Sequence, residues 1–226
     1  YSMNITYLLC SICLLVSSVQ ARQDTLRIAP DVRLLRDSTT QMLLQTSIND
    51  FLHSSATPIR ENPLVLPEDA LATSLLLDEL QGIGYDKQSK DSGFYTPYLV
   101  SIVPRSDSVF LVQVAYWGLR DSMPLLKASI RFIAQKHNHA FTFRSPLPEM
   151  TAAWKSSIIG HYTFHYKSTL ATAKAKDFQS TITFYDTKLG AKTHPTEFYC
   201  ASTFDEALQL CGIDYTTSIA RVRSAI

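Results

Sequence analysis

The chain has 226 residues, 46% of them hydrophobic and 18% charged, which is an ordinary composition for a globular protein with one large core or two small ones. Its 21 Lys and Arg against 20 Asp and Glu leave a formal charge of +1. The basic face typical of a nucleic-acid-binding protein is therefore not predicted, and no block of like charge indicates an interaction tail.

The first 21 residues contain no charged side chain. An apolar stretch from Tyr7 to Val16 precedes Val19 and Ala21, which are spaced as in a secretory cleavage site. The stretch is shorter than the ~20 apolar residues that a membrane-spanning helix needs. We therefore expect residues 1–21 to be a bacterial signal peptide, and the mature protein to be secreted or periplasmic without a membrane span. Because Lys and Arg are missing before the apolar stretch, an uncleaved anchor is the alternative.

Two helices and four strands are predicted next. Apolar side chains recur at intervals of three and four in residues 31–55, and Pro67 opens a second helix over residues 67–81. Strands are predicted over 98–103, 109–117, 125–135 and 140–144. This order predicts an α+β domain over residues 24–148, in which two helices pack on a four-stranded antiparallel sheet. An NTF2-like or cystatin-like sheet satisfies the same order.

A proline-rich segment at residues 145–149 indicates a domain boundary. Beyond it the sequence predicts a strand over 158–166, a helix over 170–189, a short strand over 196–200 and a helix ending at Leu210. The long helix carries an apolar stripe that we expect to be buried: Leu170, Phe178, Ile182, Tyr185 and Leu189. Residues 149–226 therefore predict an incomplete α/β unit, because two short strands cannot form an independent core.

No complete catalytic motif is present in the sequence. His161 and His165 have the spacing of a metallopeptidase pair, but on one strand their Cα atoms would lie ~13 Å apart, too far to share a zinc ion. No G-x-S-x-G elbow, dinucleotide-binding loop or P-loop occurs. Cys200 and Cys211 are expected to stay unpaired, because the intervening helix would carry them about 12 Å apart. We expect no catalytic residue, metal or cofactor in this chain.

Aromatic residues are concentrated in the predicted sheet. A curved sheet lined by aromatic side chains can enclose a ligand pocket, although such residues more often fill the core between sheet and helices. The candidates for lining a pocket are Tyr98, Phe110, Tyr116, Trp117, Phe132 and Phe143.

Two stretches in the second half carry a resemblance to a family. The first is Trp154-Lys155 with residues 159–166, and the second is residues 198–208 with 211–215. They resemble the opening strand, and then the next strand and helix, of the peptidase-MA-like (gluzincin) domain of secreted bacterial proteins. Residues 94–118 are similar to the α+β domain that precedes it. In that family the zinc-binding H-E-x-x-H helix lies further along; nothing here matches it, so no functional residue is carried over.

The resemblance implies a non-catalytic N-terminal region of an exported zinc-metallopeptidase-like protein. Its α+β domain would position or recognise a peptide or protein substrate, and zinc would belong to a longer parent protein. Residues 216–226 depart from the family pattern, which a truncation or frameshift after Tyr215 would explain. The rival hypothesis is a complete secreted binding module that uses the curved sheet to bind a ligand or a protein.

Overall fold

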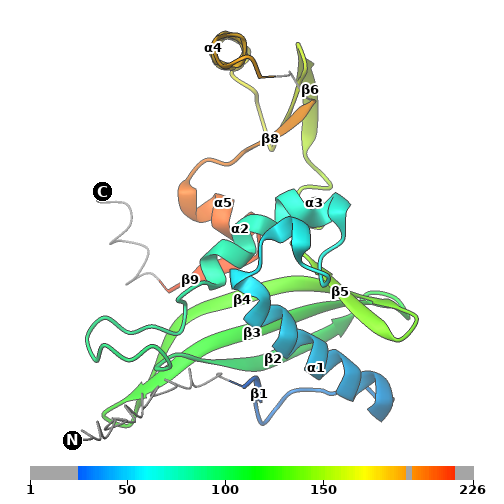
Figure 1. The fold of residues 1–226 in the computed structure, drawn as a ribbon, viewed down its shortest axis with the longest axis vertical. Coiled ribbons are helices and arrows are strands. Elements are labelled where there is room, and N and C mark those ends of the chain that lie inside the picture. Colours follow the sequence, from blue (N-terminus) through cyan, green and yellow to red (C-terminus); the bar gives the residue numbers. More distant parts are fainter. Residues whose placement is uncertain (1–24, 192–194, 217–226) are drawn as a thin grey trace, which may run out of the picture.

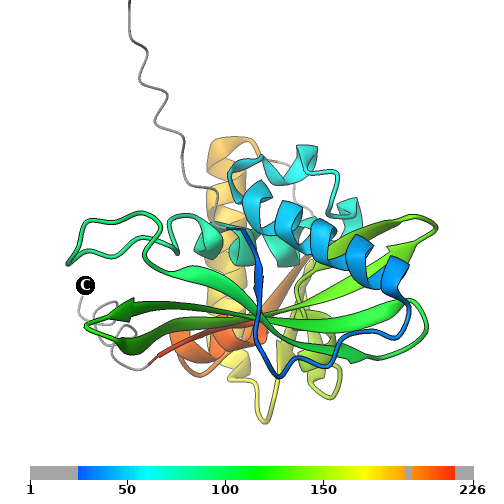
Figure 2. The same cartoon turned by 90° about the horizontal axis from the view of Figure 1, so that it is seen from below.

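The computed structural model describes residues 25–191 and 195–216. The expected signal peptide and residues 217–226 lie outside the described residues. The fold is α+β, as predicted, with a mixed sheet and several helices. A large sheet carries helices on one face, and a smaller sheet with its own helix projects from one end (Figures 1 and 2).

The large sheet has six strands in the order β1-β2-β3-β4-β5, with β9 also pairing with β4. The four predicted strands form its antiparallel centre, β1 adds in parallel to β2, and β9 adds antiparallel to β4. The sheet is therefore mixed and six-stranded rather than the predicted four-stranded antiparallel one, and the NTF2-like or cystatin-like assignment stays a prediction. The strand bounds are β1 (Arg27–Ile28), β2 (Thr96–Pro104), β3 (Val109–Arg120), β4 (Met123–His137), β5 (Ala140–Arg144) and β9 (Ile213–Tyr215).

Helices α1 (Ser38–His53) and α2 (Ala70–Leu80) cover one face of this sheet (Figure 2). The carboxylate of Asp37 caps α1 by accepting hydrogen bonds from the backbone N–H groups of Thr39 and Thr40 at 3.3 and 3.1 Å. This cap makes the helix begin later than the predicted residue 31. Three short 3-10 turns complete this layer: Ser54–Ala56, Ile59–Glu61 and Pro67–Asp69.

The main core lies between these helices and the sheet. Phe51 of α1 is fully buried, and its ring lies 4.6 Å from that of Phe143 and 5.2 Å from that of Phe132 between centroids. On β3, alternate residues from Phe110 to Tyr116 face the same layer and are buried, as the period of two in a strand requires. This stretch of β3 therefore presents an apolar surface to the helices.

The smaller sheet contains β6 (Lys155–Ile159), β7 (Tyr162–Tyr166) and β8 (Thr196–Cys200), next to α4 (Thr172–Leu189). The predicted single strand over 158–166 was wrong, because Gly160, with φ of +62°, and His161 form a turn between β6 and β7. Glycine reaches this left-handed conformation at little cost. The chain enters the unit through a short helix, α3 (Leu147–Met150).

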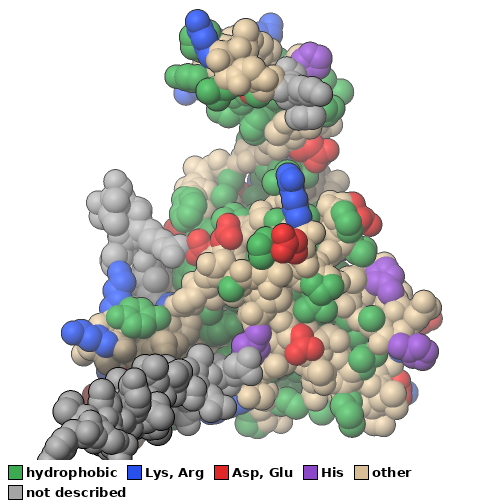
Figure 3. Space-filling model, in the orientation of Figure 1, with side chains coloured by type: hydrophobic (Ala, Val, Ile, Leu, Met, Phe, Trp, Pro, Cys, Tyr) green, Lys and Arg blue, Asp and Glu red, His purple; other side chains and the backbone are tan. Residues whose placement is uncertain are grey.

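The predicted buried stripe on α4 was wrong in part, because Leu170 and Ile182 are half-buried against the small core but the other three residues are exposed. Ala175 is the residue of α4 that is buried, whereas Phe178, Tyr185 and Leu189 are 47%, 57% and 80% exposed. A sheet of three short strands offers one helix little surface to cover, and its core is limited to Tyr162, Phe164 and Ala175. Figure 3 shows the resulting hydrophobic side chains on the surface of this unit, at the top of the molecule.

After β8 the chain returns to the large sheet through α5 (Phe204–Leu210) and β9, and the Thr203 hydroxyl caps α5 by accepting from the backbone N–H of Glu206 at 3.0 Å. Leu208, Cys211 and Ile213 belong to the main core. The backbone N–H of Arg131 donates to the carbonyl oxygen of Gly212 at 2.7 Å, between the segments of β4 that pair with β5 and β9. The domain boundary between residues 148 and 149 stays a prediction. Residues 204–215, which lie beyond it, pack with the large sheet and its helices. Cys200 and Cys211 are free thiols.

Candidate binding site on the open face of the large sheet

The sheet face that points away from α1 and α2 carries exposed apolar side chains near one end of β3 and β4. Leu119 is 62% exposed and Leu126 is 47% exposed, whereas Tyr98 and Trp117 are half-buried beside them. Trp117 is the cross-strand partner of Leu126. Cross-strand partners project from the same face of a sheet, so these side chains form one surface.

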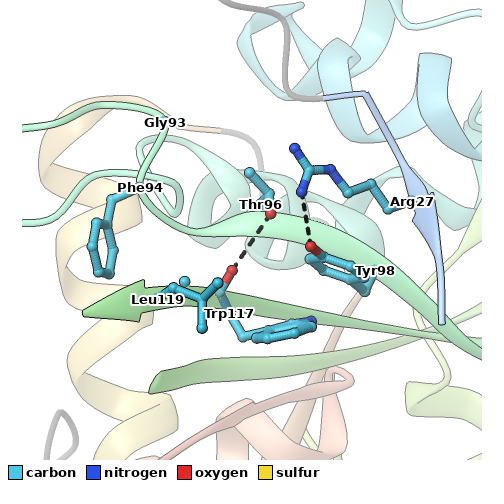
Figure 4. Close-up of a pocket in the computed structure, with 8 residues that line it drawn as sticks. Arg27, Gly93, Phe94, Thr96, Tyr98, Trp117 and Leu119 are labelled. Carbon is cyan, nitrogen blue, oxygen red and sulfur yellow. Dashed lines mark hydrogen bonds between the residues drawn. The ribbon is translucent and has the colours of Figure 1, made fainter. Parts of the chain in front are cut away.

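A cavity of about 190 Å³ lies at this surface, lined by residues from β1, β2, β3 and the loop before β2 (Figure 4). The ring centroids of Tyr98 and Trp117 are 4.5 Å apart. Arg27 of β1 donates a hydrogen bond from Nη1 to the hydroxyl of Tyr98 at 2.9 Å, and its guanidinium carbon lies 5.6 Å from the Tyr98 ring centroid. The parallel pairing of Arg27 with Tyr98 in the sheet places the cation over the Tyr98 ring.

Phe94 forms another wall of the cavity, and Gly118 allows it to approach β3. A Cβ atom at position 118 would lie 2.5 Å from the carbonyl oxygen of Phe94 and 2.6 Å from its ring. Any side chain there would therefore push Phe94 away from the strand. The guanidinium of Arg120 also lies 5.2 Å from the Phe94 ring centroid, a cation–π contact that helps to hold the ring in place.

Asp86 anchors the loop that carries Phe94. Its carboxylate accepts hydrogen bonds from the backbone N–H and hydroxyl of Ser89 at 2.8 and 2.7 Å, and from Arg120 at 2.8 Å. The backbone hydrogen bond from Ser89 is the main reason that the pKa of Asp86 lies below its ordinary value of 3.8, and Arg120 lowers this pKa further. The same carboxylate thus links the loop to the arginine that contacts Phe94.

Because the pKa of Asp86 is lowered on folding, its contribution to stability is fully present above pH 3.8 and is lost as the pH falls through the folded-state pKa. We expect Asp86→Asn to lower the urea midpoint of unfolding at pH 6, and this difference from the wild type to narrow below pH 3.8. Midpoints measured between about pH 3 and pH 6 test this. Asp107→Asn, in the exposed turn before β3, is the control. A midpoint difference between Asp86→Asn and the wild type that stays constant over this pH range would contradict the prediction.

The six predicted pocket residues separate into two groups. Tyr98 and Trp117 line the cavity together. The other four are buried between the sheet and the helices and are 5% exposed or less: Phe110, Tyr116, Phe132 and Phe143. Tyr116 and Trp117 are neighbours on β3 and therefore point to opposite faces, which explains the split.

Sequence reasoning missed Arg27, Phe94 and Leu119 as lining residues. Arg27 is 71 residues from Tyr98 in the sequence and lies on a strand of two residues, so no local pattern indicates it. Phe94 had an indirect signal in Gly118, since a glycine inside a strand often allows another group to approach closely.

The two histidines with metallopeptidase spacing do not form a site in the structure. His161 lies in the turn before β7, whereas His165 on β7 stacks on Tyr199 with ring centroids 4.6 Å apart. The nearest acidic atom to the His165 ring is Oε2 of Glu197, which lies 3.6 Å from Nε2. Within residues 25–191 and 195–216, no three His, Cys, Asp or Glu side chains are grouped to hold a metal ion.

Comparison of the chain with protein-family models, curated proteins and solved structures finds no match. In the part of the chain that the structure describes, no helix has both the length and the apolar character needed to cross a membrane. The fold and the site together therefore define an α+β protein with an aromatic, arginine-capped cavity on an open sheet face.

Proposed function

We propose that the large-sheet unit is a binding module that holds a peptide segment of a partner protein on its open face. The observation that carries this proposal is the contact of Arg27, Tyr98 and Trp117 beside exposed leucines. Tryptophan, tyrosine and arginine are the residues most enriched at the energetic centres of protein interfaces. Scattered exposed apolar residues are common, but a patch built around such a group favours a binding role.

The register of β3 and β4 extends the apolar surface beyond the cavity. Trp117 pairs with Leu126 and Leu119 pairs with Pro124, so both pairs lie on the open face. Arg27 supplies a positive charge at the margin of this surface. A partner segment with an aromatic or aliphatic side chain next to a carboxylate would complement both features.

The groups that line the cavity suit recognition. They comprise one guanidinium, the hydroxyls of Thr96 and Tyr98, and apolar side chains. An arginine stays protonated at all physiological pH values and two ordinary hydroxyls lack a neighbouring base, so this lining does not form an acid–base pair. Substrate or partner recognition is the role that the resemblance also implies for this part of the chain.

Peptide selection with a matched tryptophan control tests the proposal. Random peptides displayed on phage would be selected against the full chain, and the enriched peptides measured by calorimetry. We expect peptides that combine an acidic and an apolar residue, and Trp117→Ala should weaken their binding at least about 30-fold, as expected for a central interface residue. Trp154→Ala, which removes the other tryptophan, at a half-buried position outside the cavity, should leave binding unchanged.

Thermal melting of both variants checks that they fold. Enriched peptides that bind Trp117→Ala as tightly as the wild type would contradict the proposed site.

A second candidate function concerns the smaller sheet. The exposed apolar residues of α4, which include Phe178, Phe184 and Leu189, favour a unit that packs against a further apolar surface. The opening part of a zinc-peptidase-like domain would have this property, which supports the role of N-terminal region of such a protein. Sequencing the gene beyond the codon for Ile226 tests it. An H-E-x-x-H motif in frame on a predicted helix would support the candidate, and its absence from every frame would remove it.

A further inference from the structure

A second cavity lies at the other end of the same open face. It has a volume of about 490 Å³ and lies where β3 begins, whereas the aromatic cavity lies where β3 ends. Its floor comes from Leu111 of β3 and Ile133 of β4, which are cross-strand partners. Pro146 and Met150, at the start and end of α3, form a side wall. A volume of this size is typical of small-molecule sites.

Two arginines line the cavity. Arg105 lies in the turn before β3, and Arg131 lies on β4 two residues before Ile133, on the same face. Among the described residues, neither guanidinium makes a hydrogen bond or an ion pair to another side chain. The acidic group in the lining, Glu149, is paired with Arg144, whose Nη1 donates to Oε2 at 2.9 Å. Within the described part of the chain, Arg105 and Arg131 therefore give the cavity a net positive charge.

The rest of the lining is aliphatic. Val109, Leu111, Ile133, Pro146 and Met150 contribute it, and none offers a polar side-chain group or an aromatic ring. A ligand with a polar body would leave its own donors and acceptors unpaired here, which is costly. A flexible alkyl chain has no donors or acceptors to leave unpaired. The flexible side chain of Met150 also adapts readily to the shape of such a chain.

We infer that this cavity binds an alkyl carboxylate of the fatty-acid type, with its anionic head between Arg105 and Arg131 and its chain over Leu111 and Ile133. Guanidinium groups bind carboxylates through paired, charge-assisted hydrogen bonds. The aliphatic floor removes the chain from water. The site is separate from the aromatic cavity, so its failure would leave the proposed peptide site untouched.

Calorimetric titration of the full chain with decanoate tests the inference. We expect saturable binding of one decanoate per chain, and Arg131→Gln and Arg105→Gln should each weaken it about tenfold or more, as expected for loss of a charge-assisted hydrogen bond. Decanol, which lacks the charge, and decyltrimethylammonium, which reverses it, should each bind at least about tenfold more weakly. Arg60→Gln, at an exposed position outside both cavities, is the matched arginine control and should bind decanoate as the wild type does.

Folding of the variants is checked by their melting temperatures. Arg131→Lys keeps the charge and should retain more affinity than Arg131→Gln, a difference that a general loss of structure would not produce. The inference is overturned if decanoate does not bind, if both glutamine variants bind it like the wild type, or if the cationic detergent binds equally well.

Discussion

The Gly212→Ala variant is expected to lose about 3 kcal/mol or more of unfolding free energy, since overpacking and an unfavourable φ act together. Gly212 has a φ of +99°, which residues with a side chain rarely adopt. A Cβ atom there would overlap the carbonyl oxygen of Arg131 on β4 and lie 2.9 Å from Cδ of Pro146. The backbone of β4 cannot move aside without breaking its pairing with β3 and β5.

Gly82→Ala is the matched control for this variant. Gly82 also has a positive φ, +68°, but nothing lies within 4 Å of its ideal Cβ position. It should therefore cost only about 1 kcal/mol, from the backbone alone. Urea unfolding followed by circular dichroism measures both, and equal losses would contradict the close approach of residue 212 to β4.

A large loss in Gly212→Ala would also show that residues 204–215 stabilise the first unit. Leu208 and Ile213 are 3% and 0% exposed within its core, and Ser145 donates to the carbonyl oxygen of Cys211 at 3.1 Å. The chain therefore leaves the large sheet to form the smaller one and then returns to it. The stability of the large sheet is expected to depend on both the leaving and the returning segment.

The Phe51→Ala variant is expected to lose about 3–5 kcal/mol of unfolding free energy, the usual cost of removing a buried aromatic ring. Phe51 is 0% exposed and contacts the rings of Phe132 on β4 and Phe143 on β5. It therefore joins α1 to two strands at once. Removal leaves a cavity that the rigid sheet cannot fill.

Met42→Ala on the same helix is the control, because Met42 is 68% exposed. It should change the unfolding free energy by less than about 0.5 kcal/mol, as surface substitutions usually do. Chemical unfolding of both variants under the same conditions gives the comparison. A loss below about 1 kcal/mol for Phe51→Ala would mean that α1 does not pack on the sheet as described.

The order of the main elements could be read from the sequence. Pro67 marked the start of the second helix, and alternation located the four central strands, because a strand with one buried face shows a period of two along its length. These features depend on residues that are close together in the sequence, so the sequence alone is enough to reveal them.

The sequence did not reveal β1 and β9, whose lengths are two and three residues. Neither is long enough to show a period, and both exist only because the edges of β2 and β4 offer unpaired backbone groups. The exposure of the apolar side of α4 was likewise decided by how little surface β6, β7 and β8 present. Amphipathic spacing indicates which residues share a face, but not whether anything covers that face.

For the candidate site, the sequence determined that aromatic residues would gather on the sheet, and the tertiary structure decided which of them are accessible. Tyr98 and Trp117 point to the open face, whereas Phe132 and Phe143 fill the core beneath α1. Arg27 joins the pair only because β1 folds back beside β2. Pairing between strands that are distant in the sequence sets these contacts, and no local pattern encodes it.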